Sequence, residues 1–475
     1  MILGFAATVF VVVAVVHYYL WRRLVRGTTL PGRARRVLTW VLVGLGLLVP
    51  ATLVGSRLGE GHWLAWPGFM WLAIMFYLVV FLVVLEIPRA LALLAIRRSE
   101  RAQSADATAL GTTAADVAAA AAPTGSLSGV SSAAGADLSP GIGTTSASPG
   151  TAPTGVSSAG SVGAAVSAGS PAGVSSAGSA GRGSVELGAT TTAADQDRQH
   201  PDVSRRLFLG RATALAAGVA AISTVGYGVR TALGDPVIER VTVPMPALDP
   251  RLNGLRFAVV SDIHLGPITG ITHTQRIVRM INELEADVVT IVGDLVDGTV
   301  RELGHLAKPL KSLESSYGSY FVTGNHEYYT ANGPDEWVQE LDQLGVRSLR
   351  NERTEITHKG AVLDLAGVND VNGDPDFDKA LGGRDTSRPV VLMAHQPVQV
   401  KRAAEFGVDL QLSGHTHGGQ MVPFNLVVPL QQPVVSGLAT VDDVQVYVTR
   451  GAGFWGPPVR VGAPPEITML EFKSV

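Results

Sequence analysis

The 475-residue sequence contains no cysteine, and its formal net charge is only -3. Without a thiol the chain can form no disulfide, thiolate metal site or cysteine nucleophile, so any metal must be held by His, Asp, Glu or Asn. The near-neutral charge gives no global electrostatic reason to bind a polyanion, and we expect no nucleic-acid partner. Carboxylate, imidazole and amide groups are therefore the candidates for function.

The first hundred residues consist largely of apolar runs, at residues 2–20, 37–54 and 63–96. Each is long enough to cross a hydrocarbon core of about 30 Å as a helix. The third is longer than a crossing requires, and we expect it to end near Pro88. Residues 1–100 are therefore predicted to form a three-helix transmembrane region.

Arginines predict how this region is oriented. Six of them lie between the first two runs, whereas the loop after the second run carries only Arg57 beside Glu60. Because cytoplasmic loops carry the excess of basic residues, the first loop should be cytoplasmic. A fourth apolar run follows Ser204-Arg205-Arg206, and we interpret residues 204–235 as a signal resembling a twin-arginine export signal or as a fourth transmembrane helix. Either interpretation places the chain after it on the extracytoplasmic side.

Residues 101–203 are built mainly from Ala, Gly, Ser, Thr, Val and Pro. Side chains of this kind bury too little apolar area to offset chain entropy, so we predict a low-complexity disordered linker.

After residue 236 the sequence pattern changes to short apolar runs rich in β-branched residues. These runs predict buried strands at 255–261, 288–292, 319–323, 389–394 and 410–413, with helical patterns at 274–285 and 336–344 between them. We therefore expect residues 236–475 to form a layered α/β domain.

Side chains able to bind metal follow all five predicted strands. In chain order they are Asp262 and His264, then Asp294, then Asn325, His326 and Glu327, then His395, and finally His415 and His417. Singly, such residues are more often caps or turn residues. Ligands gather beyond the carboxyl ends of strands in α/β folds, so the repetition at five strand ends predicts a metal site.

The spacing of these residues supports a shared site. In Asp262-x-His264 and His415-x-His417 the period of an extended chain places both side chains on one face. Small residues that allow close approach of the backbone precede three of the groups, at Gly293, Gly324 and Gly414. Oxygen and imidazole ligands suit Mn, Fe, Zn or Co rather than Cu(I).

The order and flanking residues of these segments resemble the five motifs of the calcineurin-like metallophosphoesterases. The segments are Asp262-Ile263-His264, Gly293-Asp294, Gly324-Asn325-His326-Glu327, His395 and Gly414-His415-Thr416-His417. The resemblance covers residues 255–472, about half of the chain. Gly418-Gly419-Gln420 and the stretch from Gly451 to Glu466, including Arg460, are similar to the bacterial cell-envelope branch of that family.

This resemblance implies a four-layer αββα sandwich that binds two divalent metal ions. One ion would be held by Asp262, His264, Asp294 and His417, and the other by Asp294, Asn325, His395 and His415. His326 matches the catalytic histidine of the family, which contacts the phosphate and assists the leaving group. The family often has Asp where this chain has Glu327, which leaves an orienting role for Glu327 open.

The implied activity is hydrolysis of a phosphomonoester, phosphodiester or pyrophosphate, of a lipid or a cell-envelope precursor. It would take place outside a bacterial cytoplasmic membrane that the chain crosses several times. The alternative is a membrane sensor or scaffold whose domain keeps its metals and binds a phosphorylated ligand without turnover. The complete ligand set and His326 favour the enzyme, and the oligomeric state is not predicted.

Other polar residues receive simpler interpretations. Asp297, three residues after Asp294, is expected to be a turn or supporting residue rather than a ligand of a third metal. The remaining histidines of the domain lie outside the strand-end pattern and are expected at the surface; they are His273, His305 and His358. Phe454 and Trp455 either form an apolar wall for a lipid or nucleotide or belong to ordinary packing.

Overall fold

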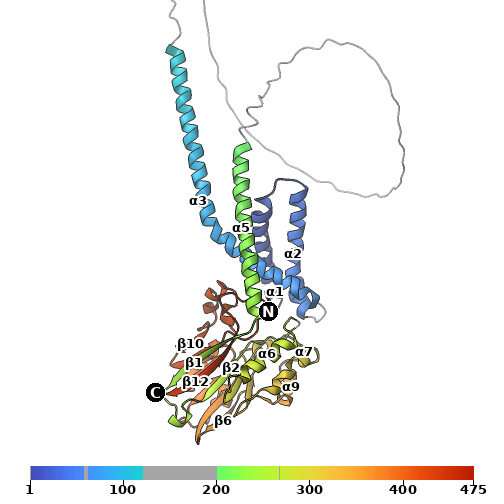
Figure 1. Ribbon diagram of the computed structural model, residues 1–475, viewed down its shortest axis with the longest axis vertical. Coiled ribbons are helices and arrows are strands. Elements are labelled where there is room, and N and C mark those ends of the chain that lie inside the picture. The colour runs from blue at the N-terminus through green and yellow to red at the C-terminus, as the bar shows by residue number, and fades with distance from the viewer. Residues whose placement is uncertain (1, 58–61, 121–199, 267) are drawn as a thin grey trace, which may run out of the picture. The chain divides into compact units, whose positions relative to one another are not determined.

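The computed structural model describes residues 2–57, 62–120, 200–266 and 268–475 (Figure 1). Met1–Ala95 and His200–Val475 belong to one compact unit, and Ile96–Gln199 belong to a second. Most of the predicted linker, residues 121–199, lies outside the described residues. The described parts of the predicted linker, residues 101–120 and 200–203, are helical and belong to the long helices before and after it.

Long helices make up the N-terminal part. They are α1 (Ile2–Leu20), α2 (Arg33–Arg57), α3 (His62–Ala120) and α5 (His200–Leu233), with the π-helical segment η1 at Trp21–Arg26. Among the described residues, three segments are long and apolar enough to cross a membrane: Arg33–Gly55, Trp63–Ser99 and Arg205–Leu233. Exposed apolar side chains such as Trp40, Ile87 and Leu215 lie along them, as expected of helices in contact with lipid. The first predicted crossing coincides with α1 and stays a prediction.

The expectation that the third apolar run ends near Pro88 is wrong for the helix. α3 contains both Pro67 and Pro88 and continues to Ala120. A proline removes one backbone hydrogen bond, but the residues after Pro88 are mainly Ala, Leu and Arg, which are strong helix formers. The helix therefore continues into the predicted linker.

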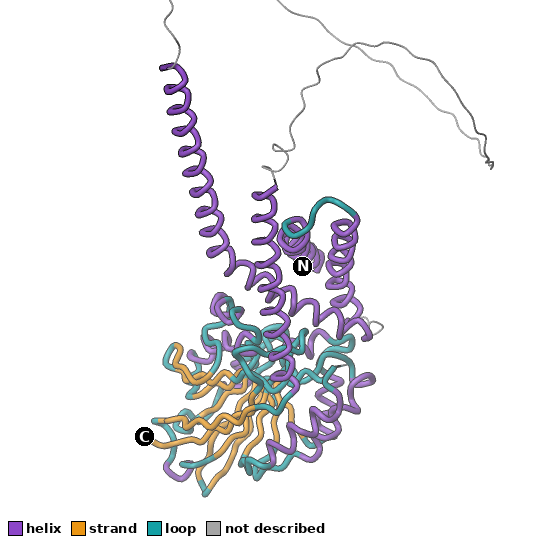
Figure 2. The backbone as a smooth tube through the Cα atoms, turned by 45° about the horizontal axis from the view of Figure 1, so that its top comes forward, coloured by secondary structure: helices purple, strands orange, loops and turns teal. Residues whose placement is uncertain are grey.

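Two six-stranded sheets form the C-terminal domain (Figure 2). The first has the order β1-β12-β2-β3-β4-β5 and the second the order β10-β11-β9-β8-β7-β6. Strands of the first sheet are β1 (Val237–Met245), β2 (Arg256–Val260), β3 (Val288–Val292), β4 (Ser319–Val322), β5 (Val346–Ser348) and β12 (Glu466–Ser474). Strands of the second are β6 (Glu352–His358), β7 (Ala361–Gly367), β8 (Val390–Met393), β9 (Leu410–Ser413), β10 (Gly437–Val441) and β11 (Val444–Val448).

Alternating side chains of the strands build separate hydrophobic layers. In β2, Phe257 and Val259 belong to the core between the sheets, whereas Ala258 and Val260 pack with helices. The first sheet is covered by α6 (Gly270–Asn282), α7 (Val300–Ala307) and α9 (Asp335–Gln343). The second is covered by α10 (Phe377–Leu381) and α11 (Val400–Ala404). The predicted αββα sandwich is confirmed.

The five predicted strands correspond to β2, β3, β4, β8 and β9, and the two predicted helices to α6 and α9. β2, β3 and β4 are parallel neighbours in the first sheet, and β8 and β9 are parallel neighbours in the second. Within each sheet, the carboxyl ends of these strands therefore lie along one edge. Short helical segments complete the domain: α8 (Asn325–Tyr329), η2 (Pro250–Leu252), η3 (Lys308–Ser312), η4 (Pro397–Gln399), η5 (His417–Gly419), η6 (Phe424–Leu426) and η7 (Val428–Leu430).

β1 follows α5 in the chain and pairs in parallel with β12, from Val237 opposite Glu466 to Met245 opposite Ser474. β12 pairs with β2 on its other side. The C-terminal end of β12 therefore lies at the end of β1 that is farther from α5.

Candidate metal centre

The residues predicted to bind metal come together where the two sheets meet. In the part of the chain that the structure describes, three groups of side chains each bring ligand atoms within 4.8 Å of one another: Asp262 with His264 and His417, Asp294 with His395 and His415, and His264 with Asp294 and His326. Asp294 belongs to two of these groups. Each of the first two groups contains three of the four residues that the family resemblance implies for one cation, and the ligand sets themselves stay a prediction. The grouping of His326 with His264 and Asp294 was not predicted.

Individual distances describe how close the ligand atoms lie. Asp294 Oδ2 is 3.2 Å from His395 Nε2 and 3.8 Å from His264 Nε2. Asp262 Oδ1 is 3.3 Å from His417 Nε2. Because His395 and His417 follow strands of the second sheet while the two aspartates follow strands of the first, the centre requires both sheets.

The backbone of the centre adopts an uncommon conformation. Left-handed φ angles between 49° and 70° occur at Asp262, His264, Asp294, His415 and His417. Few non-glycine residues adopt this region, and such residues cluster at functional sites, where the surrounding structure holds them in place. Here each of these residues follows the carboxyl end of a buried strand.

Two glycines make room for these ligands. A Cβ atom at Gly324 would overlap the Asp294 carboxylate, and one at Gly414 would overlap Ser261 and the Asp262 carboxylate. The expectation that these glycines allow close approach is confirmed.

Asp297 connects two histidines of the centre. Its Oδ1 atom accepts hydrogen bonds from His264 Nδ1 at 2.8 Å and from His326 Nδ1 at 2.7 Å. Burial opposes ionisation, yet the charges and hydrogen bonds of the two rings hold the pKa of Asp297 well below its ordinary value. With Nδ1 bound in this way, each ring keeps Nε2 for another partner. Asp297 is thus the supporting residue that its position suggested.

Glu327 holds two of the ligand-bearing loops together, which answers the question left open by the sequence. Its carboxylate is fully buried and accepts hydrogen bonds from the backbone N–H groups of Asp294, Leu295, Val296 and Gly324. Burial, and then the charge of Asp294, raise the pKa of Glu327 to about 8, and its backbone hydrogen bond from Gly324 opposes that rise. The hydrogen-bond geometry favours the ionised form against this shift, because all four partners are donors and a proton on either oxygen would face an N–H group.

Arg460 supports the His417 loop from within the domain. Its guanidinium is fully buried and donates to the carbonyl oxygens of His417, Gly451, Gly453 and Ala463, and it lies 3.2 Å from His417 Nδ1. Burial and then the charge of Arg460 lower the pKa of His417 well below its ordinary value. The sequence marked Arg460 only through the family resemblance.

The electrostatics of the centre fit cation binding, which needs unprotonated imidazole and ionised carboxylate. Burial, with the neighbouring His395, lowers the pKa of His415 to about 4. Burial opposes charge on His395, but Asp294 raises the pKa of His395 well above its ordinary value, so a cation there would displace a proton. Asn325 Oδ1 is buried and makes no hydrogen bond within the described part of the chain, as an oxygen reserved for a ligand would.

Aromatic residues surround His326. Its ring centroid is 5.4 Å from that of Tyr329 and 5.9 Å from that of Trp455, which is 50% exposed. Gln420 fixes Trp455, because its side-chain amide accepts from Trp455 N and donates to Trp455 O. Trp455 therefore lines the approach to His326, whereas Phe454 is buried and belongs to the packing.

One prediction about the other histidines is wrong. His273 is buried on the inner face of α6, and burial lowers its pKa to about 4. The sequence signal for this burial is helical periodicity, because His273 lies four residues before Ile277 on the apolar face of α6. His305 is exposed, and His358 is half-buried and hydrogen bonded to the Tyr317 hydroxyl.

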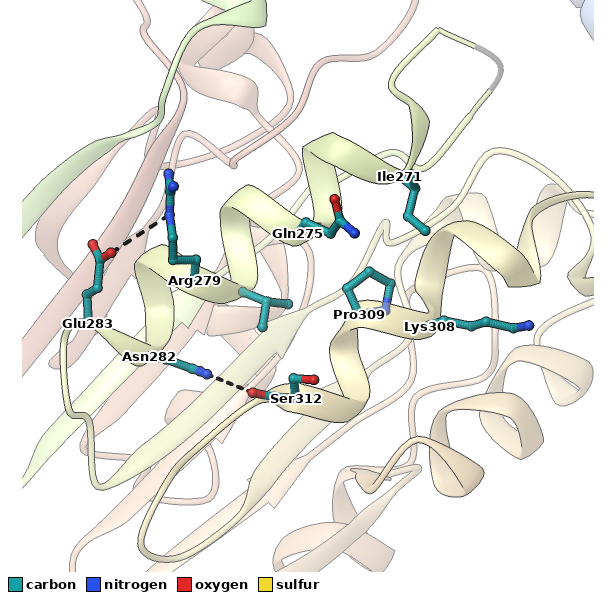
Figure 3. Close-up of a pocket in the computed structure, with 9 residues that line it drawn as sticks. Ile271, Gln275, Arg279, Asn282, Glu283, Lys308, Pro309 and Ser312 are labelled. Carbon is teal, nitrogen blue, oxygen red and sulfur yellow. Dashed lines mark hydrogen bonds and ion pairs between the residues drawn. The ribbon is translucent and has the colours of Figure 1, made fainter.

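A surface groove of about 730 Å³ lies away from the metal centre, between α6 and η3 (Figure 3). Its lining includes Gln275, Arg279, Lys308 and Pro309. It is an open surface groove that contains none of the clustered metal-binding residues.

Comparison with known proteins identifies the domain. The calcineurin-like phosphoesterase family model matches residues 255–419. A Bacillus subtilis metallophosphoesterase, YkuE, is 30% identical over 283 residues, which cover 57% of this chain and 98% of that protein. The chain belongs to the metallophosphoesterase family. A Helicobacter pylori metallophosphoesterase is 38% identical over 260 residues, covering 52% of this chain and 68% of that protein.

A membrane-associated relative also exists among animals. A Danio rerio protein named transmembrane protein with metallophosphoesterase domain is 40% identical over 278 residues, covering 56% of this chain and 63% of that protein. The matched region of this metallophosphoesterase thus spans just under two thirds of that relative. Its name and the three candidate spans agree in associating the chain with a membrane.

Proposed function

We propose that the chain is a hydrolase that cleaves a phosphate ester with the help of two divalent cations. Asp262, His264, Asp294 and His417 would hold one cation, and Asp294, Asn325, His395 and His415 the other. The observation that carries the proposal is the position of Asp294, whose carboxylate lies 3.8 Å from His264 of the first set and 3.2 Å from His395 of the second. A carboxylate shared in this way is suited to bridge two cations.

Cations bound there would lower the pKa of a water molecule and neutralise charge that develops on phosphoryl oxygens. The chain itself supplies the ligands, their orientation through Asp297 and Glu327, and a proton at His326. Burial opposes charge on His326, but Asp294 and the hydrogen bond that His326 donates to Asp297 raise the pKa of His326 to about 9. A ring that is protonated at neutral pH can stabilise the phosphate and donate a proton to the departing alkoxide.

We further propose that the domain lies on the extracytoplasmic side of a bacterial cytoplasmic membrane and acts on an amphiphilic ester of a lipid or an envelope precursor. Support comes from the arginines of η1 and of the start of α2, from Arg205 and Arg206 before the apolar part of α5, and from the position of β1 directly after α5. Protease treatment of intact protoplasts checks the topology, because a domain that stays uncut would have to lie inside.

Metal content and turnover of the purified full-length protein test the activity. The substrates are p-nitrophenyl phosphate and its bis ester with added Mn, and the variants are Asp294→Asn and His326→Ala. We expect Asp294→Asn to lose both metal and turnover. His326→Ala should keep its metal and lose about 10²–10⁴-fold in rate.

The matched control is His305→Ala, because His305 is exposed and lies outside the clustered ligand groups. It should keep both metal and turnover. Bound metal in the unsubstituted chain without turnover above the His326→Ala level would replace the hydrolase with a phosphate-binding sensor.

A further inference from the structure

An exposed apolar loop emerges from the metal centre. It comprises residues 421–430, which we call the 421–430 loop, and contains the two short turns η6 and η7. Its exposed large side chains are Val422, Phe424, Leu426, Val427 and Leu430, with Leu426 at 74% and Leu430 at 87% exposure. No charged residue occurs from Met421 to Val435. So many exposed apolar side chains in one short segment indicate contact with another apolar phase.

The loop is fastened to the ligand-bearing segments at both ends. Its first residue follows Gln420, three residues after His417, and Met421 N donates to Gly419 O at 2.5 Å. Beyond its other end, Thr416 Oγ1 donates to Val435 O at 2.6 Å. The loop therefore cannot move far without disturbing the segment that carries His415 and His417.

The base of the loop also contacts two helices that are candidate membrane spans. The Tyr77 hydroxyl donates to Val422 O at 3.0 Å, and Tyr77 lies inside the candidate span Trp63–Ser99. Val422 N donates to Val461 O, and the adjacent Arg460 N donates to Gly228 O at 2.9 Å. Gly228 lies inside the candidate span Arg205–Leu233.

Side-chain packing extends these contacts. Val459 is fully buried against a cluster that includes Tyr77 and Leu82 of α3 and Val225 of α5, and Met421 packs on the same cluster. The base of the loop, at Met421, thus packs on helices whose own outer surfaces suit lipid. The residues it contacts there lie inside two candidate spans.

We propose that the 421–430 loop inserts into the bilayer that α3 and α5 cross, so that the metal centre opens at the membrane surface. The occupant of this apolar surface is lipid of the same membrane, because the loop is attached to the helices that traverse it. Its residues play no part in holding cations. They set the distance between the centre and the phosphate groups of molecules embedded in the bilayer.

The absence of native cysteine permits a direct test. Leu426→Cys and Leu430→Cys variants of the full-length chain are labelled with a fluorophore and reconstituted into phosphatidylcholine and phosphatidylglycerol vesicles. The matched control is Val475→Cys, which is 70% exposed and follows β12 at the end of β1 that is farther from α5. Fluorescence is measured with lipids brominated on their acyl chains and, separately, with aqueous iodide.

We expect brominated lipid to quench both loop labels and iodide to leave them bright, with the reverse result for the Val475→Cys label. Quenching of the loop labels by iodide alone would place the loop in water and overturn the proposal. Protection from both quenchers would mean that protein, such as a second copy of the chain, covers the loop, which would also overturn it.

Insertion of the loop also has a kinetic consequence, which rests on the proposed function as well. Leu426→Asn combined with Leu430→Asn should slow cleavage of a long-chain phosphate ester held in vesicles and leave cleavage of p-nitrophenyl phosphate unchanged. Equal loss on both substrates would overturn this role of the loop. If the unsubstituted chain cleaves neither substrate, the proposed function fails, while the quenching result still decides the position of the loop.

Discussion

Replacing Glu327 with glutamine tests how the ligand-bearing loops are held. In the folded protein Oε1 accepts from Leu295 N at 2.8 Å and from Val296 N at 3.3 Å. Oε2 accepts from Gly324 N at 2.7 Å and from Asp294 N at 3.1 Å. A glutamine of the same shape keeps one oxygen, whichever way its amide is turned. Two buried N–H groups then face an NH₂ group and lose their acceptor.

The cost follows from the number of donors left without a partner. Each buried N–H group without an acceptor costs about 1–3 kcal/mol, so the substitution should lower the free energy of unfolding by about 2–6 kcal/mol. In a domain of this size, 1 kcal/mol shifts Tm by about 2–4 °C. We therefore expect Tm to fall by about 4–24 °C.

Thermal unfolding of the full-length protein in detergent, followed by tryptophan fluorescence, measures the shift. Glu283→Gln is the matched control, since the Glu283 side chain is 67% exposed and its ion pair with Arg279 is 3.8 Å long. The control should change stability by less than about 0.5 kcal/mol. A Glu327→Gln protein as stable as this control would refute the reasoning, because it would mean that the carboxyl group already carries a proton in the folded state.

Three further predictions concern the same centre. Asp297→Asn removes the charge from the oxygen shared by His264 and His326 and should lower metal affinity or turnover by about 10–100-fold, measured by metal titration and steady-state kinetics; unchanged values would contradict its supporting role. Arg460→Met leaves several buried carbonyl groups without their donor and should cost more than about 3 kcal/mol, measured by thermal unfolding; a Tm equal to that of the parent chain would argue against it. Mn at 100 times its Kd should raise stability by about 2.7 kcal/mol over the chelator-treated protein, and equal melting curves would show that no metal binds the folded state.

Much of the fold and of the candidate centre was predictable because both depend on short-range patterns. The apolar runs at β3 and β9 have the bounds that the sequence indicated, and each is followed by a potential ligand at the second residue after it. Parallel neighbours then bring those residues to one edge. That chain of reasoning needs only strand periodicity and the geometry of parallel sheets.

What could not be predicted depends on contacts between distant segments. Nothing in the sequence near Asp297 shows that one of its oxygens binds two histidine rings, and nothing near Glu327 shows that four N–H groups from two loops meet there. The left-handed backbone at Asp262 and His415 is likewise imposed by tertiary structure. His273 was misplaced because the strand-end pattern was weighed above the helical one.

The position of β12 between β1 and β2 bears on how the domain is made. During synthesis β12 is the last of these strands to leave the ribosome, so until then β1 and β2 have no partner between them and their edges stay open to wrong pairing. Closure of the first sheet must therefore wait until translation of β12 has finished. A cell that carries this domain across a membrane must move it either before the first sheet closes or after the sheet is complete. In both cases the unpaired edges of β1 and β2 need protection until β12 has paired with them.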